Sequence, residues 1–116
     1  MLRDPPSDDR SADWASATLR QSPRDRPVSA AFPGQERAKH MGELKRGDAR
    51  WDVYIEMQPD AEVGGGAVRG RVHFVGGERH RTTSWIFLEW SEREIQERFG
   101  EFSAVELWHF VEALEE

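Results

Sequence analysis

The chain has no cysteine, only one tyrosine and no long apolar run among its 116 residues. The lack of cysteine excludes a disulfide framework, a thiolate metal site and a cysteine nucleophile, so the fold must depend on its core alone. No apolar stretch approaches the roughly 18 residues of a membrane span, and the N-terminus lacks the apolar segment of a signal peptide. We therefore expect a soluble, cytoplasmic protein without a membrane partner.

Lysine is also scarce, because only Lys39 and Lys45 stand among the 16 basic residues. We interpret this arginine bias as codon usage in a GC-rich bacterial or archaeal genome. The acidic residues outnumber the basic ones and give a net charge of −6. This charge disfavours general adhesion to nucleic acid or anionic lipid, since both require a basic surface.

Composition divides the chain near residue 40. Residues 1–40 hold five of the six prolines and few large apolar side chains, and such a segment cannot bury enough surface to offset its chain entropy. We predict a disordered Pro/Arg/Asp-rich tail over residues 1–40 and a small α+β domain over residues 41–116. Met41 opens the second region, and one interpretation is that translation begins there.

Alternation of apolar and polar residues predicts three strands. The first runs from Ala49 to Met57 as a half-buried strand, and a loop containing Gly64, Gly65 and Gly66 follows it. The second begins at Val68, and the third runs from Glu78 to about Leu88. Gly76 and Gly77 are expected to form the tight turn between them.

This turn fixes a register in which His73 lies opposite His80. The polar side then collects Arg69, Arg71, His73, His80, Thr82 and Ser84, and the apolar side collects Val68, Val72, Phe74, Thr83, Trp85 and Phe87. Arg79 and Arg81 fall on the apolar side, where their stems are expected to cover the core edge while their charged ends reach water.

Two helices are predicted in the last third of the chain. Ser91 with Glu94 and Ser103 with Glu106 are capping boxes, which place helices over about Glu92 to Phe99 and Ala104 to Leu114. Gly100 is expected to end the first helix in a left-handed conformation. The apolar stripe of the second helix can lie on the sheet, and consists of Ala104, Leu107, Trp108, Val111 and Leu114.

The predicted fold class is α+β: a three-stranded antiparallel β-meander followed by two C-terminal helices packed on one face (βββαα). Four tryptophans are expected to supply much of the core, namely Trp51, Trp85, Trp90 and Trp108. The strand from Ala49 to Met57 is an edge in such a meander and lacks internal proline and lysine. We expect it to pair with its counterpart in a homodimer.

Signals for catalysis and cofactors are weak. The four histidines show no local metal-ligand spacing, and Glu106 with His109 is only half of a di-iron ligand set. The three-glycine run precedes a strand, unlike a phosphate-binding loop, and the chain has no nucleophile elbow. We therefore predict no catalytic residue, no metal and no cofactor, and consider enzyme activity disfavoured.

The charge layout supplies the candidate site. Four arginines within residues 69–81 give local positive charge, whereas residues 89–116 are strongly acidic. The expected function is a non-enzymatic protein-interaction or regulatory module, with self-association or a protein partner. The alternative is anion or nucleic-acid binding, and the candidate residues are Arg69, Arg71, His73, His80 and Arg81. Crowding by these arginines is expected to lower the pKa of both histidines below about 6.5, which would make the surface responsive to acid.

A helix from about Gln35 to Leu44 would give an α-β-β-β-α order that resembles double-stranded RNA-binding domains in topology. Such domains hold phosphates with a basic cluster at the start of their last helix. Here Glu101 and Glu106 occupy that region and would repel phosphates, so the resemblance does not extend to RNA binding.

Overall fold

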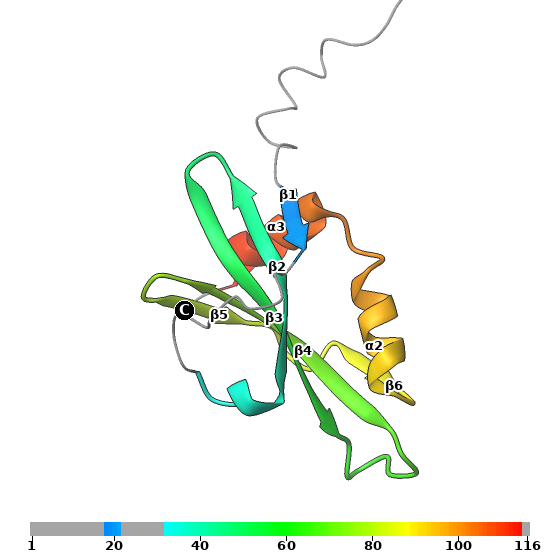
Figure 1. Ribbon diagram of the computed structural model, residues 1–116. Coiled ribbons are helices and arrows are strands. Elements are labelled where there is room, and N and C mark those ends of the chain that lie inside the picture. The colour runs from blue at the N-terminus through cyan, green and yellow to red at the C-terminus, as the bar shows by residue number, and fades with distance from the viewer. Residues whose placement is uncertain (1–17, 22–31, 115–116) are drawn as a thin grey trace, which may run out of the picture.

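The computed structural model describes residues 18–21 and 32–114 (Figure 1). Within them, one antiparallel sheet contains six strands, and two helices follow it in sequence. Five strands lie in the order β1-β2-β3-β4-β5, and β6 pairs with β4 beside β5. The elements are β1 (Thr18–Gln21), the short 3-10 helix η1 (Gln35–Arg37), β2 (Ala38–Arg46), β3 (Ala49–Pro59), β4 (Val68–Gly76), β5 (Arg79–Thr82), β6 (Phe87–Glu89), α2 (Glu92–Phe99) and α3 (Ala104–Ala113).

The α+β class, the antiparallel sheet and both C-terminal helices are confirmed, but the predicted number of strands is too small. Residues 38–46 form strand β2 rather than a helix, so the topological resemblance to double-stranded RNA-binding domains fails. The pairing of β2 with β3 shifts register between His40 and Gly42. This bulge interrupts the period of two, which explains why the alternation pattern did not reveal the strand.

The position of β3 overturns the expected route to a homodimer. β3 pairs with β2 on one side and with β4 on the other. Its backbone groups therefore have partners on both edges, and the segment from Ala49 to Met57 cannot pair with a second copy.

The predicted boundary at residue 40 falls inside β2. The first residues of β2 precede Met41 and pair with β3, and Phe32 packs on Tyr54. The described part of the predicted tail therefore belongs to the folded structure, as does β1. Residues 1–17 and 22–31 of that tail lie outside the described residues.

The hairpin between β4 and β5 differs from the predicted register by two residues. Gly76 pairs with Arg79, and His73 pairs with Thr82 instead of His80. The turn residues are therefore Gly77, with a φ of 63°, and Glu78. A shift of two residues leaves the side chains of β5 on their predicted faces, because side chains alternate with a period of two.

The predicted third strand is divided by residues 83–86. The β4–β5 pairing ends at Thr82, and the β4–β6 pairing begins at Phe87 with Gly70. Thr83 is buried, and its Oγ1 atom accepts a hydrogen bond from the Val72 backbone N–H at 3.0 Å. This irregular segment places Trp85 against Arg69 and Arg71 on the polar face, so its predicted position on the apolar face is wrong.

The main core lies between the sheet and the two helices. It contains the predicted inward residues of β3 and β4 together with Ile95 and Phe99 of α2. Arg79 and Arg81 lie on this side as predicted, with their guanidinium groups over the Trp51 ring at 4.2 and 5.0 Å from its centroid. The inner face of α3 is also confirmed, with Leu107, Trp108 and Val111 buried and Ala104 and Leu114 partly buried against the core.

The helix ends agree with the sequence in part. Ser103 and Glu106 form the full capping box. At the start of α2, the Glu94 backbone N–H donates to the Ser91 hydroxyl, but the Glu94 carboxylate accepts from the backbone N–H of Trp90 instead of that of Ser91. Gly100 has a φ of −64°, so the expected left-handed end is wrong. Trp90 is exposed rather than part of the core. Among the described residues, no helix is long and apolar enough to cross a membrane.

Candidate functional site

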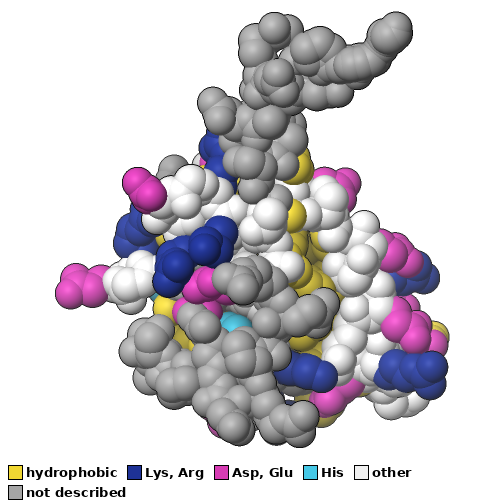
Figure 2. All heavy atoms as spheres, turned by 45° about the horizontal axis from the view of Figure 1, so that its top comes forward, with side chains coloured by type: hydrophobic (Ala, Val, Ile, Leu, Met, Phe, Trp, Pro, Cys, Tyr) yellow, Lys and Arg dark blue, Asp and Glu magenta, His cyan; other side chains and the backbone are white. Residues whose placement is uncertain are grey.

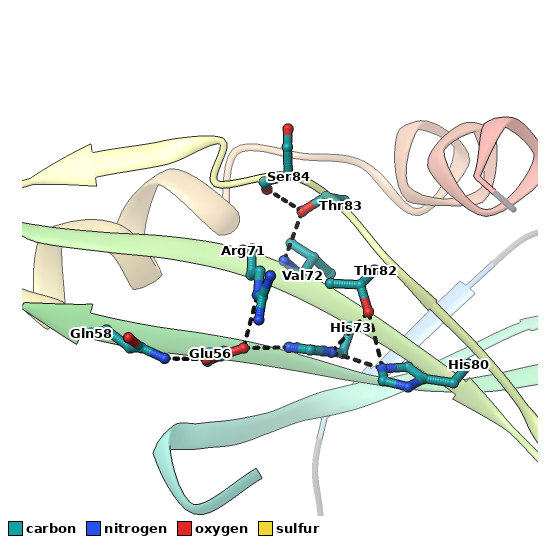
Figure 3. A network of polar contacts seen from close by, with 9 residues as sticks. All are labelled: Glu56, Gln58, Arg71, Val72, His73, His80, Thr82, Thr83 and Ser84. Atoms are coloured by element: carbon teal, nitrogen blue, oxygen red, sulfur yellow. Dashed lines mark hydrogen bonds and ion pairs between the residues drawn. The ribbon is translucent and has the colours of Figure 1, made fainter. Parts of the chain in front are cut away.

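The face of the sheet opposite the helices carries a buried polar network (Figure 3). Even-numbered residues of β3 and odd-numbered residues of β4 share this face, so Glu56 lies opposite Arg71 and Tyr54 lies opposite His73. Neither Glu56 nor His73 is a surface residue, because their side chains are 1% and 2% exposed. The strand from Ala49 to Met57 is therefore buried on both faces near its middle, although the sequence predicts a half-buried strand.

Glu56, His73 and His80 form a continuous chain of short contacts across three strands. Glu56 Oε1 lies 2.7 Å from His73 Nε2, and His73 Nδ1 lies 2.8 Å from His80 Nε2. The two imidazole rings are stacked, with centroids 5.0 Å apart. The predicted meeting of the two histidines is therefore confirmed, although they are diagonal neighbours rather than directly opposed.

The carboxylate determines where the protons lie in this chain. An ionised Glu56 can only accept, so His73 Nε2 must donate to it. In a neutral His73 ring, Nδ1 is then the acceptor, and His80 Nε2 is a suitable donor. The Thr82 hydroxyl also belongs to the network, because its Oγ1 atom lies within hydrogen-bond distance of His73 Nδ1 (3.1 Å) and of His80 Nε2 (3.0 Å). His80 Nδ1 is left as the nitrogen at the outer end of the chain.

The inner end of the chain has two further partners. Arg71 Nε donates to Glu56 Oε1 at 2.9 Å, and the side-chain amide of Gln58 donates to Glu56 Oε2. The charge of the buried carboxylate is thus balanced by an arginine and dispersed over three donors. Such multiple hydrogen bonding is what a buried ionised group requires.

A short segment that leads into β2 covers the network. We call residues 32–37 the strap. The Phe32 ring lies 4.5 Å from the His73 ring and 5.0 Å from the His80 ring, measured between centroids. Gly34 lies directly on Glu56, since a Cβ atom at Gly34 would come within 2.5 Å of its carboxylate. Figure 2 shows basic and acidic side chains side by side on one face of the molecule, with a small area of histidine near them.

Burial controls the titration of both histidines. It is the largest cause that lowers the pKa of His73, and His80 and Arg71 lower it further, while Glu56 acts in the opposite direction. Burial likewise lowers the pKa of His80, with Arg71 adding to the effect. The predicted direction is confirmed, but burial rather than arginine crowding is the main cause.

Glu56 shifts in a way that supports an ionised carboxylate. Burial alone would raise its pKa, but the hydrogen bonds from His73, Arg71 and Gln58 and the charge of Arg71 together lower it. At neutral pH the network therefore holds one carboxylate, one guanidinium and two neutral imidazoles.

The structure distributes the five predicted site residues over two faces. Arg71, His73 and His80 belong to the network, and Arg69 lies beside them with its guanidinium 4.2 Å from the Trp85 ring centroid. Arg81 is on the helix side, where its guanidinium donates to the Val111 carbonyl. The five residues therefore do not form one continuous polar surface.

Sequence reasoning missed Glu56 and Phe32, which define the inner end and the cover of the network. The signal for Glu56 was its place at an outward position of a strand otherwise rich in apolar residues. Phe32 was hidden by its proline-rich surroundings. Within the described residues, no group of three or more histidine, aspartate or glutamate side chains has the geometry of a metal site.

Comparisons of the chain with protein-family models, curated proteins and solved structures found no match. The geometry of the network is therefore the basis for assigning a function.

Proposed function

We propose that this protein is a non-enzymatic regulatory module whose strap covers a protein-docking face at neutral pH and leaves it in acid. The observation that supports this proposal is the unbroken chain Glu56–His73–His80, held at 2.7 and 2.8 Å beneath the Phe32 ring. Two adjacent neutral imidazoles, one buried and one partly buried, are well suited to respond to protons near physiological pH.

The hydrogen-bond pattern makes the response stepwise. The first proton goes to His80 Nδ1, which leaves the donor from His80 Nε2 to His73 in place. A second proton on His73 Nδ1 would direct an N–H at the N–H of His80, across a distance of 2.8 Å. Two donors at this separation repel, and both rings would then carry positive charge near Arg71. Doubly protonated histidines therefore favour a state in which the strap has moved and water reaches the rings.

Other charged groups also lie around the network. Glu56 from β3 is the carboxylate in direct contact with His73, and it is already bonded to Arg71 from β4. On the β2 side, His40 and Asp52 are paired at 3.0 Å, and the His40 ring contacts Tyr54. From the strap, Glu36 and Arg37 are exposed and bring charges of opposite sign.

The sign of the pH effect follows from the lowered pKa values. The covered state binds protons at its histidines less readily than the uncovered state, whose histidines titrate near about 6.5. Stability of the covered state is therefore complete above that pH and decreases as the pH falls through it toward the lower pKa values of the covered state. Departure of the strap would expose Tyr54, Val75 and two imidazolium groups, which suits a partner segment that carries a carboxylate.

Anion or nucleic-acid binding through the same residues is the alternative. Arg71 is already bonded to Glu56, His73 is buried and Arg81 faces the helices, which disfavours this alternative. Fluorescence anisotropy with labelled RNA and DNA over a salt series distinguishes the two, because phosphate-driven binding weakens steeply with added salt.

The proposal is tested with 4-fluorophenylalanine placed at residue 32 and followed by fluorine NMR between about pH 8 and pH 5. We expect the resonance to move from a ring-stacked to a solvent-exposed position as the histidines titrate, while the same label at the buried Phe74 does not move. His80→Gln keeps a donor toward His73 but cannot titrate, so it should reduce the acid response. His109→Gln, on the exposed face of α3, is the matched control. A Phe32 resonance that stays constant while His73 and His80 take up protons would contradict the proposal.

A further inference from the structure

A row of exposed apolar side chains runs along β6 and its flanks. Ile86, Leu88 and Trp90 are 39%, 51% and 64% exposed. They occupy alternate positions, while Phe87 between them is buried in the core. The row therefore faces away from the helices, on the side of the sheet that carries the strap.

The loop between β3 and β4 extends this row. A Cβ atom at Gly65 would lie 3.9 Å from the Trp90 ring, so the ring lies beside the glycine turn. Val63 in the same loop is 50% exposed. Scattered apolar residues are normal on a surface, but a contiguous group with an exposed tryptophan is typical of a binding site.

A cation borders the row. Arg69 pairs with Leu88 in the sheet register and shares its face. Its guanidinium lies on the Trp85 ring, with Arg71 at the same distance of 4.2 Å from that ring. Within residues 32–114, the Nε atom of Arg69 is buried without a hydrogen-bond partner. The stacking orients the partly exposed side chain, and a carboxylate at the surface would pair with the charge of its guanidinium.

The backbone of β6 favours an extended ligand. Within the described part of the chain β6 pairs with β4 alone, and the other edge of this three-residue strand is not joined to a further strand. An exposed strand edge with apolar side chains beside it is suited to an extended segment.

We propose that the β6 face, formed by Ile86, Leu88, Trp90 and Arg69, binds an extended segment of a partner protein that alternates apolar and acidic residues. The apolar side chains of the partner segment would cover Leu88 and Trp90, and one of its carboxylates would pair with the Arg69 guanidinium. This surface goes beyond the acid response, since its three apolar side chains are exposed while the strap is in place.

The net charge of the protein makes the test selective. With −6 overall, nonspecific attraction favours a basic peptide. A short labelled peptide alternating leucine and glutamate is compared by anisotropy with its leucine–lysine counterpart, at pH 7.5 where the strap is in place. We expect the acidic peptide to bind about tenfold more tightly.

Variants locate the binding. Trp90→Ala should weaken binding of the acidic peptide by about tenfold. Arg69→Gln should remove the preference for the acidic peptide over the basic peptide. Arg93→Gln, on the exposed side of α2, is the matched control and should change neither value. Circular dichroism confirms that each variant is folded.

Three results would overturn the proposal: no binding of the acidic peptide, equal binding of both peptides, or binding unchanged by Trp90→Ala and Arg69→Gln. Light scattering at increasing protein concentration tests a second copy as the occupant. Self-association that Trp90→Ala abolishes would assign the face to a homodimer and also contradict the proposal. These results test the β6 face alone, whereas movement of the strap is tested separately by the fluorine resonance at residue 32.

Discussion

Both faces of the sheet are buried near its centre, but by different means. The helix face is covered by α2 and α3 and contains almost only apolar side chains, such as Val53, Ile55 and Phe74. The opposite face is covered near its centre by a six-residue strap and contains a carboxylate and two imidazoles. The first face is stable regardless of proton concentration, whereas the second is stable only while its histidines stay neutral. A single sheet thus combines a permanent core with a conditional one.

The strongest test of the permanent core is Phe74→Ala. Phe74 is fully buried and central to the helix face, so its loss should lower the free energy of unfolding by about 4 kcal/mol. Because Phe74 lies in a cluster of buried apolar side chains, the loss should be the same at pH 7.5 and pH 5.5. Urea denaturation at the two pH values measures it, and a loss that changes strongly with pH would mean that the two faces are coupled.

The conditional core is tested by Glu56→Gln. This change removes the charge that accepts hydrogen bonds from His73 and Arg71, and should lower the free energy of unfolding by about 2 kcal/mol at neutral pH. Glu97→Gln removes an exposed carboxylate on α2 and is expected to have an effect near zero. Equal effects of the two substitutions in urea denaturation would show that the network contributes nothing to stability.

The contact between the strap and the sheet is tested by Gly34→Ala. Gly34 has a φ of +86°, and its Cβ atom would meet the Glu56 carboxylate. Gly47 has a φ of +59° with open space around it, so Gly47→Ala includes the backbone strain without the collision. The strain alone amounts to about 1 kcal/mol. We expect Gly34→Ala to lose more than Gly47→Ala in urea denaturation, with the Phe32 fluorine resonance shifted toward its acid position already at neutral pH. Identical losses for the two alanines would show that the strap adapts.

The sequence predicts the helix face well and the strap face poorly, for a physical reason. Period-two alternation and capping boxes are local signals, and they placed β3, β4, α2 and α3 within a few residues. Burial of Glu56 depends on Phe32 and Gly34, more than 20 residues away along the chain. The contact between β3 and β4 that joins Glu56 to His73 follows an eight-residue connection, longer than the turn of a two-residue hairpin, so no local feature fixes its register.

The candidate residues show the same limit. The sequence predicts that His73 and His80 lie together, since the hairpin turn places both on one face even when the register is displaced by two residues. The predicted face of Trp85 is wrong because residues 83–86 leave the regular strand, and alternation no longer determines the face of a side chain within such a break.

The chain order has a consequence for biosynthesis. Phe32 leaves the ribosome before its partners, and the ring it covers at His80 is synthesised 48 residues later. Each hairpin from β2 to β5 joins strands that are neighbours in sequence, so the sheet can assemble in the order of synthesis. The strap, in contrast, can reach its final position only when the β5 strand is in place. Docking of Phe32 is therefore a late folding event, and it reports completion of the face that it covers.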